Sequence, residues 1–171
     1  MEGSGIGSTI DVAPDLREWT AIRQWLESFC LASGIGRDIR LKLELAAEEW
    51  FINVVTHGFA GKADAGRDSQ DAAEPLVRLG IGRKRDEVIL ELVDNGPAYN
   101  PLERKDPDIT LPVEQRPIGG LGIYLIKNLM DSCRYERLDG CNRLTLRKRI
   151  ANKSRQPSEG GNEPDDAGSG T

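Results

Sequence analysis

Residues 41–59 read LKLELAAEEWFINVVTHGF and combine a periodic apolar pattern with three polar residues at fixed spacing. Apolar residues recur every three or four positions, which predicts a helix over residues 37–56 that ends before the glycine. Glu49, Asn53 and His57 fall at successive four-residue steps and therefore lie in one column of this helix. The core stripe consists of Leu43, Ala47, Trp50 and Val54. Taken alone, the column favours a solvated helix face with an incidental acid and amide, although a carboxylate beside an apolar stripe is costly without a partner.

A second polar group follows the apolar run at residues 88–93, where Asp94-Asn95-Gly96 comes directly after a predicted strand. A turn explains it, because Asn-Gly is a common turn pair. A binding site explains it equally well. An Asp at a strand end accepts a hydrogen bond from an exocyclic amine, and a glycine lets a ring approach the backbone.

Gly119-Gly120-Leu121-Gly122 precedes a helical stripe that begins at Ile123. One interpretation is a flexible entry into the helix. The other is a phosphate cradle, because a helix N-terminus offers unpaired N–H groups and the positive end of the helix dipole. Four such residues are a weak signal on their own.

The remaining periodic segments predict one further helix, at residues 14–34, and two hairpins. Residues 77–81 alternate and residues 88–93 are nearly all apolar, so together they predict an antiparallel hairpin. Asp139-Gly140 separates two further strand segments and is a strong hairpin signal. Helices first, hairpins next and one late helix imply an α/β fold, a two-layer sandwich with a mostly antiparallel, mixed sheet.

Composition divides the chain into a flexible N-terminus at residues 1–9, a folded domain at 10–150 and a tail at 151–171. The tail has no Leu, Ile, Val or aromatic residue, so we expect it to be disordered. Residues 61–74 are expected to form a loop. Residues 96–118 hold five of the nine prolines, and a loop of this length is expected to be functional.

Charge and cysteine content exclude several classes of protein. The net charge is -5 from 28 acidic and 23 basic residues, with no basic stripe, so direct nucleic-acid binding is not expected. Cys30, Cys133 and Cys141 are odd in number and widely spaced, which indicates reduced thiols rather than disulfides or a zinc site. Residues 1–9 resemble no signal peptide and no run reaches membrane-spanning length, so we expect a cytoplasmic protein without membrane contact.

The three polar groups in this order resemble the N, G1 and G2 boxes of the GHKL ATPase superfamily. The boxes are Glu49-x-x-x-Asn53-x-x-x-His57-Gly58-Phe59, Asp94-Asn95-Gly96-Pro97 with Tyr99-Asn100-Pro101, and Gly119-Gly120-Leu121-Gly122-Ile123. The chain looks most like the anti-sigma-factor serine/threonine kinase branch, over residues 11–149. The resemblance implies the Bergerat ATP-binding fold, with the helices on one face of the sheet.

By that resemblance the chain binds ATP and Mg²⁺. Asn53 would coordinate the metal, Asp94 would bind the adenine amino group, and Gly96 would make room for the base. Glu49 would be the catalytic base. The phosphates would lie against Gly119, Gly120, Leu121 and Gly122.

Other assignments that follow from the resemblance stay open. Residues 96–118 would be the ATP lid, and Arg104, Lys105 or Arg116 would meet the γ-phosphate. Thr145 falls where the superfamily often places a polar residue near the adenine, and a plain strand threonine explains it equally. His57 is expected to be structural rather than a phosphoacceptor.

The resemblance implies an ATP-dependent kinase and anti-sigma factor of a partner-switching system. It would phosphorylate an anti-sigma-factor antagonist of the STAS type, hold a sigma factor in its other complex, and form a homodimer. The alternatives are a non-catalytic ATP-binding regulatory switch and a detached sensor-histidine-kinase ATPase domain.

Overall fold

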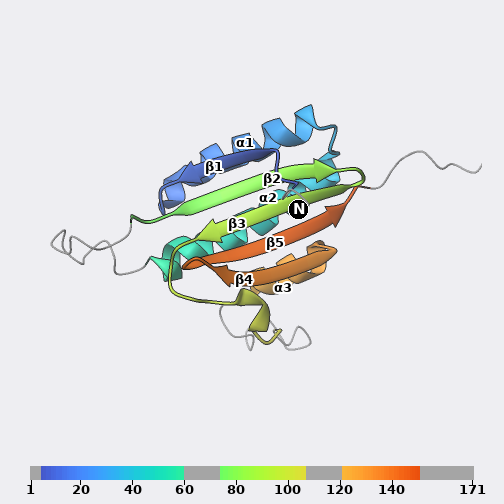
Figure 1. Ribbon diagram of the computed structural model, residues 1–171. Helices are drawn as coiled ribbons and strands as arrows, with labels where there is room; N and C mark the ends of the chain where they lie inside the picture. Colours follow the sequence, from blue (N-terminus) through green and yellow to red (C-terminus); the bar gives the residue numbers. More distant parts are fainter. Residues whose placement is uncertain (1–4, 60–73, 107–120, 151–171) are drawn as a thin grey trace, which may run out of the picture.

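One antiparallel sheet of five strands forms one layer of the molecule (Figure 1). The computed structural model describes residues 5–59, 74–106 and 121–150. The strands are β1 (Ser8–Val12), β2 (Val77–Lys84), β3 (Glu87–Asp94), β4 (Ser132–Leu138) and β5 (Cys141–Arg149). Their order is β1-β2-β3-β5-β4. The α/β class and the mostly antiparallel sheet are confirmed, and among the described strands every pairing is antiparallel, without the parallel pair that a mixed sheet would add.

Both predicted hairpins are present and close through two-residue turns. Asp139 and Gly140 have φ values of 50° and 76°, and positive φ at both central residues is what a type I′ turn requires. In the β2–β3 hairpin, Arg85 has a φ of 56° between the paired residues Lys84 and Glu87. The hairpins therefore fix the register of β2, β3, β4 and β5 locally.

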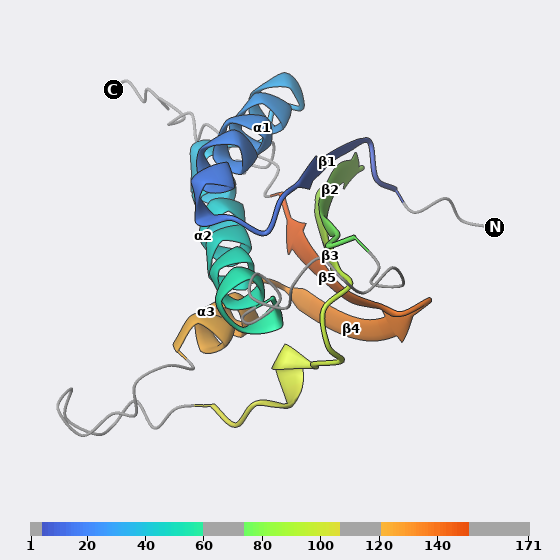
Figure 2. The same ribbon diagram turned by 90° about the vertical axis from the view of Figure 1, so that its left-hand side faces the viewer.

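The described α-helices cover one face of this sheet (Figure 2). They are α1 (Trp19–Ala32), α2 (Arg37–Asn53) and α3 (Leu121–Leu129), with the short turns η1 (Leu16–Glu18), η2 (Val54–Gly58) and η3 (Pro101–Glu103). The predicted core stripe of α2 is buried, and it packs against apolar side chains of β2, β3 and β5 in one core. No helix of the described residues is long and apolar enough to cross a membrane.

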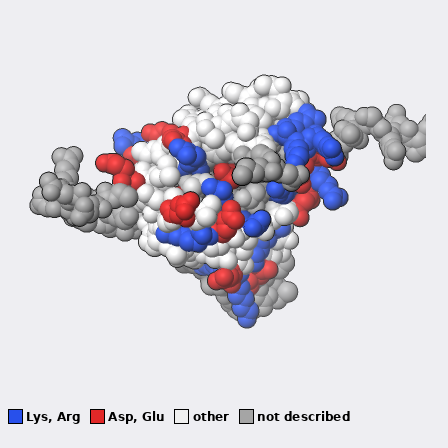
Figure 3. Space-filling view, in the orientation of Figure 1, with Lys and Arg blue, Asp and Glu red and all other residues white. Residues whose placement is uncertain are grey.

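The other face of the sheet carries acidic and basic side chains interleaved across neighbouring strands (Figure 3). Arg78 of β2 pairs with Asp11 of β1 at 2.6 Å, and Arg147 of β5 pairs with Glu87 of β3 at 2.8 Å. This face is therefore a charged outer surface.

The first strand begins earlier than the sequence indicated. Ser8 and Thr9 belong to β1 and pair with Ile81 and Gly80, so the flexible segment expected over residues 1–9 is wrong for these two. The Ser8 hydroxyl accepts a hydrogen bond from the Trp25 indole at 2.9 Å, which ties the strand to α1. Because Ser8 and Thr9 are polar and follow a glycine, the sequence lacks the apolar alternation that would have predicted a strand here.

The second helix changes its winding before its end. It was predicted to continue to residue 56, but the α-helix stops at Asn53 and a π-helical turn follows to Gly58. The turn closes where the Phe59 N–H donates to the Val54 carbonyl at 3.2 Å. Such wide turns occur frequently at functional sites. Residues 60–73, 107–120 and 151–171, including most of the expected lid and the whole tail, lie outside the described residues.

Candidate functional site

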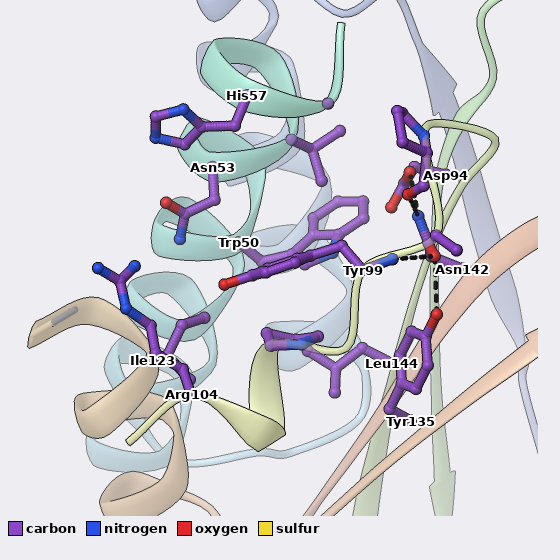
Figure 4. A pocket seen from close by; sticks show the side chains of 15 residues that line it. Trp50, Asn53, His57, Asp94, Tyr99, Arg104, Ile123, Tyr135, Asn142 and Leu144 are labelled. Atoms are coloured by element: carbon purple, nitrogen blue, oxygen red, sulfur yellow. Dashed lines mark hydrogen bonds between the residues drawn. The ribbon is translucent and has the colours of Figure 1, made fainter. Parts of the chain in front are cut away.

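A cavity of about 580 Å³ lies between the end of α2 and one end of the sheet (Figure 4). Its α2 side presents Trp50, Asn53 and His57, and its sheet side presents Asp94, Asn142 and Leu144. A second cavity of about 220 Å³ is lined by Glu49, Leu121 and Gly122 and shares Asn53, Arg104 and Ile123 with the first. The first volume is in the range of small-molecule sites.

Asp94 is the last residue of β3 and is only 4% exposed. Its Oδ1 accepts the Gly96 N–H at 2.9 Å and the Asn142 Nδ2 at 2.8 Å. Burial raises the pKa of Asp94, while the hydrogen bonds from Asn142 and Gly96 and the charge of Arg137 lower it. A buried carboxylate turned to a cavity with one oxygen already satisfied is suited to accept a ligand hydrogen bond on the other.

Gly96 supports this carboxylate from behind. A methyl group at Gly96 would come within 2.8 Å of the Asp94 Oδ1 and 3.4 Å of the Gly58 carbonyl. Gly96 does not line the cavity, whereas Pro97 and Ala98 after it do. The glycine is therefore required by the close approach of its own turn to Asp94 and η2.

Asn95 serves the turn and not the cavity. Its side chain accepts the Leu76 N–H at 2.8 Å and donates to the Glu74 carbonyl at 2.7 Å. Its own N–H donates to the Leu76 carbonyl at 3.2 Å. Asn95 thus joins the start of β2 to the turn after β3, which confirms the turn interpretation. Asp94 lies in the wall of the cavity, and its binding of a ligand amine stays a prediction.

The column predicted on α2 reaches both cavities. Glu49 lines the smaller one, Asn53 lines both, and His57 lines the larger one from η2. Figure 4 shows Asn53 and His57 across the cavity from Asp94, with the Arg104 guanidinium on their side. The larger cavity therefore has a buried acceptor at one end and amide, imidazole and guanidinium groups at the other.

Gly122, in the first turn of α3, lies directly against Glu49. A methyl group added at Gly122 would overlap the Glu49 carboxylate. The absence of a side chain thus lets α3 approach α2 and leaves the carboxylate in the smaller cavity. Gly119 and Gly120 lie outside the described residues, and Leu121 and Gly122 line that cavity.

The segment after β3 brings one of the three predicted lid cations to the site. Arg104 lines both cavities, Lys105 lines neither, and Arg116 lies outside the described residues. Lys127 of α3 holds this segment, because its Nζ donates to Asp106 at 2.8 Å and to the Arg104 carbonyl at 3.4 Å.

Thr145 lies away from the cavity. Successive strand residues point to opposite faces, and in β5 the buried positions are Asn142, Leu144 and Leu146. Thr145 is therefore on the outer face, as the plain-strand alternative expects, and the structure does not bring it to the cavity. Asn142, which pairs with Asp94 across β3 and β5, occupies the inner face instead.

Asn142 and three aromatic residues were missed in the sequence. Trp50 was assigned to the core stripe only, Tyr99 was quoted in the second box without a role, and Tyr135 was not singled out, yet all three line the larger cavity. Tyr99 is 52% exposed and extends from the sheet side towards α2 (Figure 4). The alternation of Leu144 and Leu146 was the signal that could have placed Asn142 on the inner face.

Apolar walls, one buried carboxylate acceptor and a polar, partly cationic end fit a specific kind of ligand. A flat ring that carries an amino group suits the first end, and an anionic chain suits the second. The smaller cavity places a second carboxylate, Glu49, beside the polar end.

Comparisons with known proteins identify relatives of this chain. The model of the histidine kinase-like ATPase domain family matches residues 12–148. The serine/threonine-protein kinase BtrW of Bordetella bronchiseptica is 30% identical over 146 residues, which are 85% of this chain and 96% of that protein. The serine-protein kinase RsbW of Bacillus cereus is 32% identical over 123 residues, covering 69% of this chain and 70% of that protein.

A solved structure shares the fold at low sequence identity. The crystal structure of the RsbU and RsbW domains of Rv1364c from Mycobacterium tuberculosis superposes with a TM-score of 0.55 at 15% identity. The match covers 87% of this chain and 34% of that chain. The similarity therefore concerns one fold unit within a longer protein.

Proposed function

Because the chain belongs to the histidine kinase-like ATPase domain family, we propose that it is an ATP-dependent protein serine/threonine kinase and anti-sigma factor. Its proposed substrate is an anti-sigma-factor antagonist of the STAS type, and the proposed second partner is a sigma factor. The observation that carries the kinase proposal is the position of Glu49. Its carboxylate lies in a cavity that adjoins the Asp94 cavity through Asn53 and Arg104.

The adenine of ATP is proposed to bind at the sheet end of the larger cavity. Asp94 would accept a hydrogen bond from the exocyclic amino group, and Trp50, Ile123 and Leu144 supply apolar surface for the ring. A hydrogen bond to a charged acceptor contributes more than one between neutral groups. This end therefore fixes which base is bound and how it is oriented.

The phosphates are proposed to lie towards Asn53, Arg104 and the first turn of α3. Arg104 is the lid cation that we assign to the γ-phosphate, because it lines both cavities. The Asn53 amide oxygen fits Mg²⁺, which takes hard oxygen ligands and usually has few protein ligands beside the phosphates. When bound, Mg²⁺ would neutralise charge on the phosphate oxygens.

Glu49 is proposed to be the general base for the acceptor serine. It would accept the hydroxyl proton as the serine oxygen bonds to the γ-phosphorus and the bond to the β-γ bridging oxygen breaks, with release of ADP. Gly122 leaves room for this carboxylate. A side chain at this position would displace the carboxylate from the cavity, so the glycine would serve the proposed reaction.

Glu49→Gln tests the proposal, because it preserves shape and removes the basic group. The variant should bind ATP as wild type does but lose phosphotransfer by about 10² to 10⁴ in rate. Glu48→Gln is the matched control, since Glu48 is the preceding residue of α2 and lines neither cavity. The assay uses labelled ATP, Mg²⁺ and purified STAS-domain proteins of the same organism, and reads phosphoserine and ATP affinity separately.

Each result of this assay has a definite meaning. Equal transfer by wild type and Glu49→Gln would remove Glu49 from the mechanism. ATP binding without transfer to any STAS protein that forms a complex with the chain would favour the non-catalytic regulatory switch. A homodimer and a cytoplasmic location remain parts of the proposal, and light scattering of the purified chain measures the first.

A further inference from the structure

The Asn142 side chain is the most highly connected polar group of the described site. It is 8% exposed and lies opposite Asp94 in the β3–β5 pairing. Its Nδ2 donates to the Asp94 Oδ1 at 2.8 Å and to the Pro97 carbonyl at 2.9 Å. One amide therefore joins the end of β3 to the segment that follows it.

Three donors from other parts of the chain converge on the Asn142 Oδ1, and Figure 4 shows the bonds from Tyr99 and Tyr135. The Tyr99 N–H donates at 3.2 Å, the Tyr135 hydroxyl at 2.9 Å and the Arg137 Nη1 at 2.9 Å. An amide NH₂ group cannot accept these bonds, so the atom that faces Tyr135 and Arg137 must be the oxygen. The NH₂ group must consequently face Asp94.

This orientation determines what Asp94 presents to the cavity. Its Oδ1 already accepts hydrogen bonds from the Asn142 amide and the Gly96 N–H, so this oxygen cannot also carry a proton that would point at those donors. Burial raises the pKa of Asp94, and the hydrogen bonds that Asn142 and Gly96 donate oppose this effect because they favour the ionised form. Arg137 adds positive charge nearby, and the same Nη1 donates to the Gly96 carbonyl at 2.9 Å. Asp94 is thereby held as an acceptor on the cavity side.

We propose that Asn142 is a positioning residue that fixes Asp94 as a hydrogen-bond acceptor and so sets the preference of the site for a base with an exocyclic amino group. The inference rests on the proposed binding of ATP in the larger cavity. It predicts that the site distinguishes purines by their 6-amino group. Asp94 accepts a hydrogen bond from the 6-amino group of adenine and cannot form this bond with a purine that lacks the group.

The test compares affinities for ATP and for purine riboside 5′-triphosphate, which lacks only the 6-amino group, by calorimetry. Wild type should prefer ATP by about tenfold or more. Asn142→Leu keeps the approximate shape and removes every hydrogen bond of the amide, so the preference should fall towards unity while affinity for the amine-free nucleotide changes little. Arg143→Gln is the matched control, because this adjacent residue of β5 lies on the outer face and should leave the ratio unchanged.

The outcomes separate the inference from the proposed function. An unchanged ratio in Asn142→Leu, or an equal loss of both affinities, would show that Asn142 is merely structural. A wild type without preference would also overturn the inference, while binding of neither nucleotide would overturn ATP binding itself. If Asn142→Leu does not fold by circular dichroism, Arg137→Met, which retains Asn142 and removes one donor from its oxygen, must lower the ratio for the inference to stand.

Discussion

Asp94 is the residue at which function and stability oppose each other. Burial raises its pKa, so the folded state binds a proton more tightly than the unfolded chain does. Its ionisation therefore lowers the free energy of unfolding as the pH rises through the folded pKa. The buried, ionised carboxylate therefore destabilises the ligand-free protein, and a hydrogen bond from a ligand amine offsets this loss of stability.

Asp94→Asn should raise the free energy of unfolding of the ligand-free chain at pH 7 and abolish tight ATP binding. The Asn oxygen can still accept from Gly96 and Asn142, but its NH₂ group would face the adenine amine with a donor. Urea unfolding should show that the difference in free energy of unfolding between the variant and wild type becomes smaller as the pH falls below the pKa of Asp94. A variant less stable than wild type, or one with unchanged calorimetric affinity for ATP, would contradict this account.

Individual site residues differed in how far the sequence could predict them. Four-residue spacing predicted that Glu49, Asn53 and His57 lie on one side of a helix, and the structure confirms this placement. Their proposed roles came from the resemblance and not from the spacing. For Thr145 the alternation of its own strand already favoured the plain-strand alternative over the place that the resemblance implied. Asn142 acquires its importance from Asp94, 48 residues away in the sequence, and only the register of β3 and β5 brings the two together.

At the scale of elements, the sequence predicted those whose signals are local. Both hairpins and α2 follow from turn residues and apolar periodicity. The π-helical turn at Val54–Gly58 was not predicted, because its sequence VVTHG has no feature that separates it from one more helical turn. The early start of β1 was missed because its partner, β2, lies about 70 residues further along the chain.

The segment that leads into β1 lies directly against Gly82 of β2. A methyl group at Gly82 would overlap the Gly5 carbonyl and come within 2.9 Å of the Ile6 Cα. Gly82→Ala should therefore displace residues 5–7 and lower the free energy of unfolding by about 1–3 kcal/mol. Gly36→Ala is the control, since nothing lies within 4 Å of its added methyl, and its cost at a helix N-cap should be smaller. Urea midpoints of the two variants measure the difference, and equal midpoints would show that the segment repacks freely.

At the scale of the molecule, the folded unit should be complete at Ile150. The sheet ends with β5 at Arg149, and the Ile150 N–H donates to the Asp86 carbonyl. Residues 151–171 have no side chain large and apolar enough to add to the core, and burial of apolar surface is what offsets the entropy of ordering a segment. A chain of residues 1–150 should therefore match the full chain in urea midpoint, in the slope of unfolding against urea and in calorimetric affinity for ATP. Because the slope scales with the surface exposed on unfolding, a smaller slope together with a lower midpoint would show that the tail packs on the domain. A change in ATP affinity alone would instead show that its charges act on the site.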